Sequence, residues 1–184
     1  AGKRNPNPER VADLFVFIPF CPTRCAYCSF VSMPVDRQRK LLRPYTDDLT
    51  EEIGWLKKRA KKLGYSIRAV YVGGGTPTAL PLDMLDEVLA ACRVRGAKEF
   101  TVEAGRPDTI TEEALALLKS RGVTRVSVNP QTFNDETLKR IGRRHTAADV
   151  ERAYALARDR FDVNMDLIAM LPGESAEDFF RTVD

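Results

Sequence analysis

The chain has 184 residues, of which 43% are hydrophobic and 30% are charged, and its formal net charge is +3. This composition is ordinary for a folded domain with a sizeable core and excludes a disordered chain. No apolar run approaches the roughly 18 residues of a membrane span, and the N-terminal stretch AGKRNPNPER lacks the apolar segment of a secretory signal. We therefore expect a cytoplasmic protein that does not contact a membrane.

The predicted elements alternate between strands and helices after a polar leader at residues 1–12. Short apolar runs of β-type residues predict strands at 14–18, 68–72, 100–103, 123–128 and 161–170. Helical spacing and capping signals predict helices at 45–63, between Pro81 and Gly96, at 111–121 and 146–157, and from 175 to the end of the chain. Such alternation indicates parallel βαβ units, hence an α/β barrel or a doubly wound sheet.

One basic cluster, at residues 57–62, could suggest a nucleic-acid patch. It lies just before Gly64, where a helix ends and its dipole favours cations. We interpret it as a solvated helix end and expect no nucleic-acid partner.

The most specific motif is a cysteine triad that follows the first predicted strand. Cys21, Cys25 and Cys28 have the spacing C-x3-C-x2-C, at the strand end where α/β barrels carry their chemistry. Three thiolates on one loop can bind three irons of a [4Fe-4S] cubane and leave the fourth iron free. S-adenosylmethionine (SAM) can chelate that iron through its amino and carboxylate groups, and a low-potential cluster could then cleave its carbon–sulfur bond.

Two other interpretations of the triad remain open. A structural zinc site needs four ligands, and the loop offers no fourth; the single histidine, His145, is expected in a solvated loop. A reactive thiol or a disulfide pair would leave one cysteine unexplained. The distant Cys92 lies on a helix face and is expected to be a buried small apolar residue.

Further polar or glycine-rich motifs end the later strands. Gly73–Thr78 reads GGGTPT, and glycines let a backbone approach a ligand closely, although such a triplet is also a common turn. Glu103 and Gln131 end strands and could bind hydroxyls or a cation. Asp166 interrupts an apolar run, where a charge needs a partner, whereas Arg143 could simply be a helix-terminal cation.

The stretch IPFCPTRCAYCSF at residues 18–30 resembles the oxygen-independent coproporphyrinogen III oxidase family of radical SAM proteins, and most of all its coproporphyrinogen dehydrogenase-like branch. The similarity runs from about Leu14 to the chain end. It implies a partial (β/α)6-type radical SAM barrel at residues 13–184, truncated after about five βα units, without its C-terminal substrate region. It also implies that the following residues contact SAM: Tyr27 on the adenine, Gly74, Gly75, Thr76, Glu103, Gln131, Arg143 and Asp166.

This chain departs from the oxidase branch at three positions. It has Phe15 where that branch has a tyrosine near the SAM sulfonium, and Phe15 is still expected to contact SAM. It has Phe17 in place of a histidine and Phe30 in place of a fourth cysteine. The resemblance implies an enzyme that decarboxylates the propionates of coproporphyrinogen III, with a reducing electron-transfer protein as partner. The departures leave a second hypothesis open, a haem chaperone or haem-processing protein that keeps the cluster and SAM.

Overall fold

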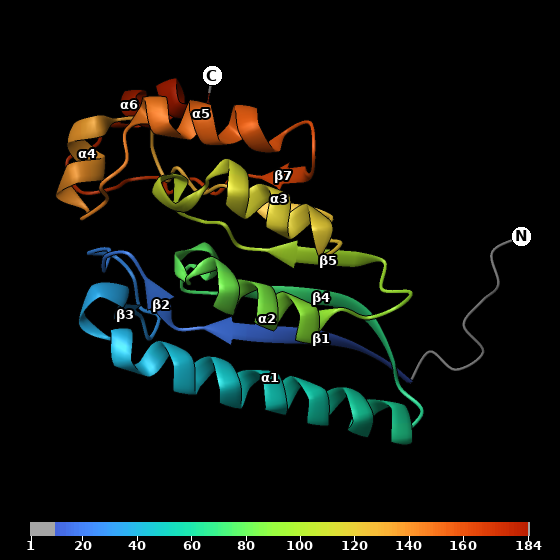
Figure 1. Ribbon diagram of the computed structural model, residues 1–184. Helices are drawn as coiled ribbons and strands as arrows, with labels where there is room; N and C mark the ends of the chain where they lie inside the picture. The colour runs from blue at the N-terminus through green and yellow to red at the C-terminus, as the bar shows by residue number, and fades with distance from the viewer. Residues whose placement is uncertain (1–9, 184) are drawn as a thin grey trace, which may run out of the picture.

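A single parallel sheet organises the computed structural model, which describes residues 10–183 (Figure 1). Its strands lie in the order β1-β4-β5-β6-β7, which is also their order along the chain. Their bounds are β1 Val11–Ile18, β4 Ser66–Gly74, β5 Glu99–Val102, β6 Arg125–Ser127 and β7 Asp162–Asn164. All four neighbouring pairs are parallel, so the carboxyl ends of the strands share one edge.

The helices cover one face of this sheet (Figure 1). Their bounds are α1 Arg39–Lys62, α2 Leu82–Cys92, α3 Glu112–Ser120, α4 Asp135–Arg140, α5 Ala147–Ala157 and α6 Ala176–Val183. Helices α1, α2, α3 and α5 pack side by side in that order. Cover on one face is the arrangement of an open barrel and not of a doubly wound sheet, so the predicted partial barrel is confirmed.

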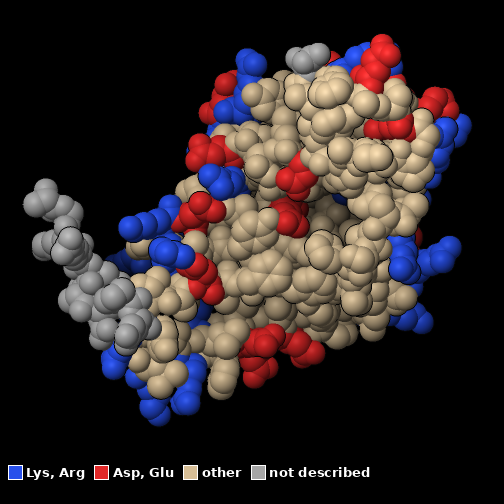
Figure 2. Space-filling view, turned by 180° about the vertical axis from the view of Figure 1, so that it is seen from behind, with Lys and Arg blue, Asp and Glu red and all other residues tan. Residues whose placement is uncertain are grey.

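The core lies between the sheet and these helices because each strand alternates its side chains. In β1, Leu14, Val16 and Ile18 are buried towards the helices, whereas Phe15 points the other way and is 59% exposed. Figure 2 shows the side opposite the helices as largely uncharged at its centre apart from a few acidic groups, with Lys and Arg at its margins. This open face is the one that a closed barrel would turn inward.

Capping side chains determine where several helices begin. Thr111 accepts a hydrogen bond from the Ala114 amide at the start of α3, and Thr146 and Asp149 form a complete capping box at α5. These two helix starts agree with the sequence prediction, because capping is a local signal.

Three element predictions need correction. Strand β1 begins at Val11 and not at Leu14. Helix α1 begins at Arg39 and not at residue 45, since the helix contains Pro44 in its interior. The last strand covers only 162–164; the chain then forms an isolated bridge between Gln131 and Leu167. Helix α4 was not predicted because six residues give too short a periodic pattern.

Part of the predicted leader lies outside the described residues, which begin at residue 10. Its division from the core at residue 12 stays a prediction, although β1 already starts at Val11. No helix among residues 10–183 is long and apolar enough to cross a membrane.

Candidate functional site

The cysteine loop begins at the carboxyl end of β1 and is held by contacts from two directions. A two-residue strand β2, Phe20–Cys21, pairs with β3, Met33–Pro34. On the other side, the Ala26 amide donates to the Ile141 carbonyl at 3.0 Å and the Thr23 hydroxyl donates to the Gly142 carbonyl at 2.9 Å. The loop is therefore tied to the segment that follows α4, more than one hundred residues later in the sequence.

The three loop thiols are free and half-buried. Burial raises the pKa of the Cys21 thiol, which is close enough to Cys25 and Cys28 for their charges to raise it further. Among residues 10–183, no three Cys, His, Asp or Glu side chains are grouped to hold a single metal ion. A structural zinc ion takes four ligands, whereas the thiolates of a cubane each bind a different iron, so three cysteines on one loop suit a cluster better than zinc.

The glycine motif at the end of β4 lies directly against the start of the cysteine loop. The Gly75 amide donates to the Ile18 carbonyl and the Thr76 amide to the Phe20 carbonyl, both at 2.7 Å. A Cβ atom at Gly75 would lie 2.6 Å from the Phe20 carbonyl oxygen and 3.1 Å from the Cys21 sulfur. Glycine is thus required here by close approach to the loop, and the Thr76 hydroxyl lies 3.5 Å from the same sulfur.

Glu103 is held beside the glycine motif on the open face of the sheet. Its carboxylate accepts from the Gly74 amide at 3.1 Å and from the Tyr71 hydroxyl at 2.5 Å. The Tyr71 ring in turn stacks on Phe15, with centroids 5.9 Å apart. Tyr71 was not predicted as a site residue, because its partner Glu103 is 32 residues away in the sequence.

Arg143 closes the opposite side of the site. Its guanidinium donates to the carbonyls of Gly105 at 3.2 Å and Asn129 at 2.7 Å, and to the Tyr27 hydroxyl at 2.9 Å. Burial raises the pKa of Tyr27 to about 12 even though Arg143 opposes the shift. Arg143 is 8% exposed, so it is not the solvated helix-terminal cation that its sequence context also allowed.

Gln131 adopts an unusual backbone conformation within the same region. Its φ is 70°, a left-handed value that costs energy for a residue with a side chain. Within residues 10–183, its Oε1 atom, Asn129 Oδ1 and Arg143 Nε are buried without hydrogen-bond partners. Buried polar atoms are rarely left unpaired, so these three form a cradle suited to a polar ligand.

The sequence predicted Asp166 inside an apolar strand, and this prediction is wrong. Asp166 is exposed beyond β7, and its carboxylate accepts from the Asn164 amide group at 2.9 Å. Its backbone carbonyl accepts from the Gln131 amide at 3.0 Å, so Asp166 does lie beside the predicted site.

His145 also differs from expectation, since it is 3% exposed and lies 3.8 Å from the Asp108 carboxylate. Cys92 is fully buried, as predicted, and burial raises its pKa to about 12.

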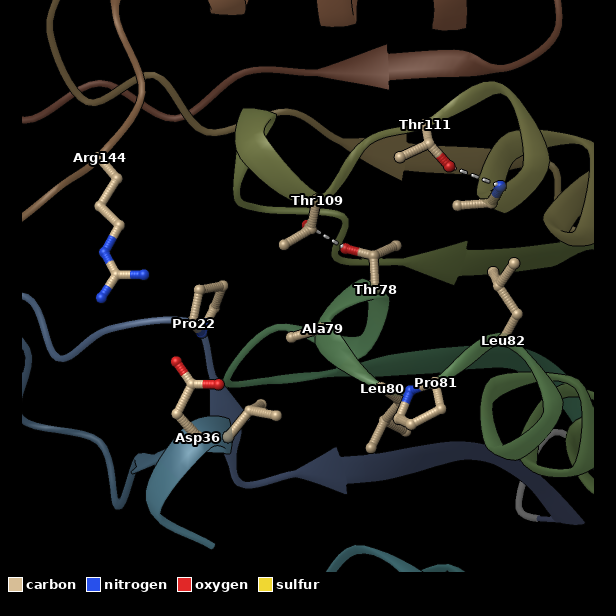
Figure 3. Close-up of a pocket in the computed structure, with 12 residues that line it drawn as sticks. Pro22, Asp36, Thr78, Ala79, Leu80, Pro81, Leu82, Thr109, Thr111 and Arg144 are labelled. Carbon is tan, nitrogen blue, oxygen red and sulfur yellow. Dashed lines mark hydrogen bonds between the residues drawn. The ribbon is translucent and has the colours of Figure 1, made fainter. Parts of the chain in front are cut away.

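A pocket of about 420 Å³ lies next to the cysteine loop but away from this site (Figure 3). Pro22 and Arg144 lie on its loop side, and the Thr78 and Thr109 hydroxyls meet in it at 2.6 Å. None of the predicted cluster or SAM residues lines it. The candidate site is instead the open face at the carboxyl ends of β1, β4, β5 and β6.

A parallel half-barrel with a three-cysteine loop at its strand ends defines a class of protein. Comparison with known protein families gives the same class. Residues 15–184 match the Radical SAM superfamily. The chain therefore belongs to the radical SAM superfamily, whose cofactors are a [4Fe-4S] cluster and SAM, as the sequence indicated.

Three of the similar proteins have names that refer to coproporphyrinogen or heme. The chain is 40% identical to the oxygen-independent coproporphyrinogen-III oxidase-like protein HemZ of Bacillus subtilis, over 95% of this chain and 37% of that protein. It is 34% identical to heme chaperone HemW of the same species, over 92% of this chain and 45% of that protein. Coproporphyrinogen III oxidase HemN of Escherichia coli superposes with a TM-score of 0.82 at 30% identity, over 96% of this chain and 41% of that protein. The chain thus spans less than half the length of these relatives.

Proposed function

We propose that Cys21, Cys25 and Cys28 hold a [4Fe-4S] cluster through three of its irons. Support comes from three free thiols on one anchored loop and from the close approach of Gly75 to Cys21. When bound, the cluster supplies the electron that cleaves SAM to methionine and a 5′-deoxyadenosyl radical.

The remaining site residues are proposed to bind and orient SAM. Gly74, Gly75 and Thr76 offer backbone and hydroxyl groups beside the loop, and Glu103 offers a carboxylate for a hydroxyl or ammonium group. The unpaired atoms of the cradle at Gln131 and Arg143 supply further polar contacts. Tyr27, which is 37% exposed, provides an aromatic surface for the adenine of SAM, and Phe15, which is 59% exposed, provides one for its sulfonium end. Asp166 is the last residue of the proposed SAM site.

The single observation that carries this proposal is the convergence of loop, glycine motif and buried polar cradle at one edge of the sheet. These residues come from four strands and from the segment after α4, and parallel strands bring them together only at their carboxyl ends.

For the whole protein, we propose oxidative decarboxylation of coproporphyrinogen III propionates, with a reducing electron-transfer protein as donor. The 40% identity to HemZ and the TM-score of 0.82 to HemN support this substrate class. The second candidate is a haem chaperone that retains cluster and SAM, favoured by the 34% identity to HemW and by Phe30 in place of a cysteine.

The cluster proposal is tested by anaerobic reconstitution of this chain followed by iron and sulfide analysis. We expect about four irons per chain, the content of a cubane, and loss of the cluster in the Cys21→Ala, Cys25→Ala and Cys28→Ala variants. Cys92→Ala is the matched control and should load normally, because that thiol is buried in the core. A wild-type chain that takes up no iron or sulfide while its thiols stay reduced would contradict the proposal.

The substrate proposal needs the natural full-length protein, incubated with SAM, reductant and coproporphyrinogen III. Formation of decarboxylated porphyrinogen together with 5′-deoxyadenosine would support the enzyme. SAM cleavage without any decarboxylated product, combined with stoichiometric haem binding, would reject it in favour of the chaperone.

A further inference from the structure

A buried arginine that the proposed cofactor contacts do not use lies next to the cysteine loop. Arg106 follows β5 and is 2% exposed. Its Nη1 atom is 3.0 Å from the Thr23 hydroxyl oxygen and 3.8 Å from the Cys25 sulfur, so it donates to both. The contact joins positions 81 residues apart in the sequence.

The guanidinium is fixed from its other side by a carboxylate. Its Nε and Nη2 atoms donate to the two Asp108 carboxylate oxygens at 3.1 and 3.4 Å. Asp108 also faces the imidazole of His145 at 3.8 Å. Burying an arginine is costly unless it is paired, and two fork-like bonds to one carboxylate fix its orientation.

This arrangement leaves one edge of the guanidinium directed at the loop. Nε and Nη2 donate to the Asp108 carboxylate, whereas Nη1 donates to the Thr23 hydroxyl and the Cys25 sulfur. An arginine serving only packing or a helix end would not need a sulfur acceptor. Arginine also keeps its charge at any relevant pH.

We propose that Arg106 is a positioning residue that holds the Cys25 ligand and raises the reduction potential of the cluster. The inference rests on the proposed function, since it requires Cys25 to bind iron. A cationic donor at a ligand sulfur stabilises the more negative, reduced state, and hydrogen bonds to the sulfurs are known determinants of Fe–S potentials. Asp108 acts through Arg106 by fixing its orientation.

The test compares Arg106→Met, Arg106→Lys and the double variant R106M/D108N, all reconstituted in the full chain. The double variant avoids leaving the Asp108 carboxylate charged without its arginine partner, so it separates the effect on the cluster from simple misfolding. Arg121→Met is the matched control, because Arg121 forms a similar two-bond pair with Asp86 away from the site. The readouts are the midpoint potential of the one-electron cluster couple and the rate of iron release to a chelator.

We expect a more negative midpoint potential and several-fold faster iron release in R106M and in the double variant. The midpoint potential of Arg106→Lys should lie between those of R106M and the wild type, because lysine keeps the positive charge but cannot form both bonds to Asp108. R121M should match the wild type. Cluster-loaded variants with the wild-type potential and release rate would overturn the role of Arg106. Failure of the wild type to load a cluster would instead reject the proposed function, so the two failures are distinguishable.

Discussion

At the scale of single residues, burial separates Cys92 from the three loop cysteines. Cys92 is completely enclosed on α2, whereas the loop thiols are half-buried at the sheet edge. The same residue type therefore serves as a core side chain in one place and as a proposed ligand in another.

We expect Cys92 to resist alkylation in the folded chain without its cluster. Burial raises the pKa of this thiol to about 12, so it stays protonated near pH 8, and the thiolate is the reacting form. Iodoacetamide labelling mapped by mass spectrometry should modify Cys25 and Cys28 first, and Cys92 only after denaturation. Equal labelling of Cys92 in the native chain would contradict its enclosure.

A second prediction at this scale concerns Tyr71, whose hydroxyl bonds Glu103. Tyr71→Phe keeps the ring stack on Phe15 and removes only that bond, so Glu103 loses orientation. If this weakens SAM binding by about 1 kcal/mol, the dissociation constant rises roughly fivefold.

Calorimetric titration of SAM into the cluster-loaded protein measures the Tyr71→Phe effect. Tyr154→Phe, an exposed position on α5, is the control and should leave the constant unchanged. Unchanged SAM affinity in Y71F would show that the bond does not orient Glu103 for the ligand.

At the scale of elements, the contact between the glycine motif and β2 brings β1 and β4 to the same site. Backbone carbonyls of Ile18 and Phe20 accept from the Gly75 and Thr76 amides. These groups cannot move aside as a flexible side chain can, so the close approach depends on the absence of a Cβ atom.

Two glycine-to-alanine changes should therefore have opposite effects. Gly75→Ala places a Cβ 2.6 Å from the Phe20 carbonyl oxygen, and we expect it to destabilise the fold by about 1–3 kcal/mol and impair cluster loading. Gly54→Ala, inside α1 with no atom within 4 Å of the new Cβ, should stabilise by roughly 0.5–1 kcal/mol. Urea unfolding of the two variants measures both; a stable Gly75→Ala with normal loading would refute the steric argument.

At the scale of the whole molecule, Asp108 links the end of β5 to the segment before α5. Burial alone would raise the pKa of Asp108, but His145 and Arg106 outweigh it and lower the pKa to about 2. A carboxyl group whose pKa is lower in the folded state stabilises the fold above its unfolded value of 3.8. That contribution disappears as the pH falls through the folded value.

We thus expect the stability difference between wild type and Asp108→Asn to be largest above about pH 4 and to shrink towards pH 2. Urea unfolding of the cluster-free chain at several pH values gives both curves. Cluster-free protein is needed because acid would also protonate the ligating thiolates. A difference that stays constant from pH 6 to pH 2 would show that Asp108 is not held in its charged form.

Local signals predicted much of the fold and part of the site. Thr111 and Thr146 marked helix starts because capping depends on a few consecutive residues. The cysteine spacing and the glycine run were equally readable. The strand at 161–170 was overestimated because apolar residues after Asn164 resemble a strand but pair only through the bridge from Gln131 to Leu167.

The amino-acid sequence by itself determined the parallel α/β order and the three candidate ligands, since each depends on spacing or periodicity within a short stretch, and the resemblance of residues 18–30 indicated the radical SAM class. Only the tertiary structure decided that Tyr71 meets Glu103, that Arg106 reaches Cys25, and that His145 is enclosed beside Asp108. These contacts join residues 32, 81 and 37 positions apart. They arise because parallel strands bring their carboxyl ends to one edge, which no local pattern encodes.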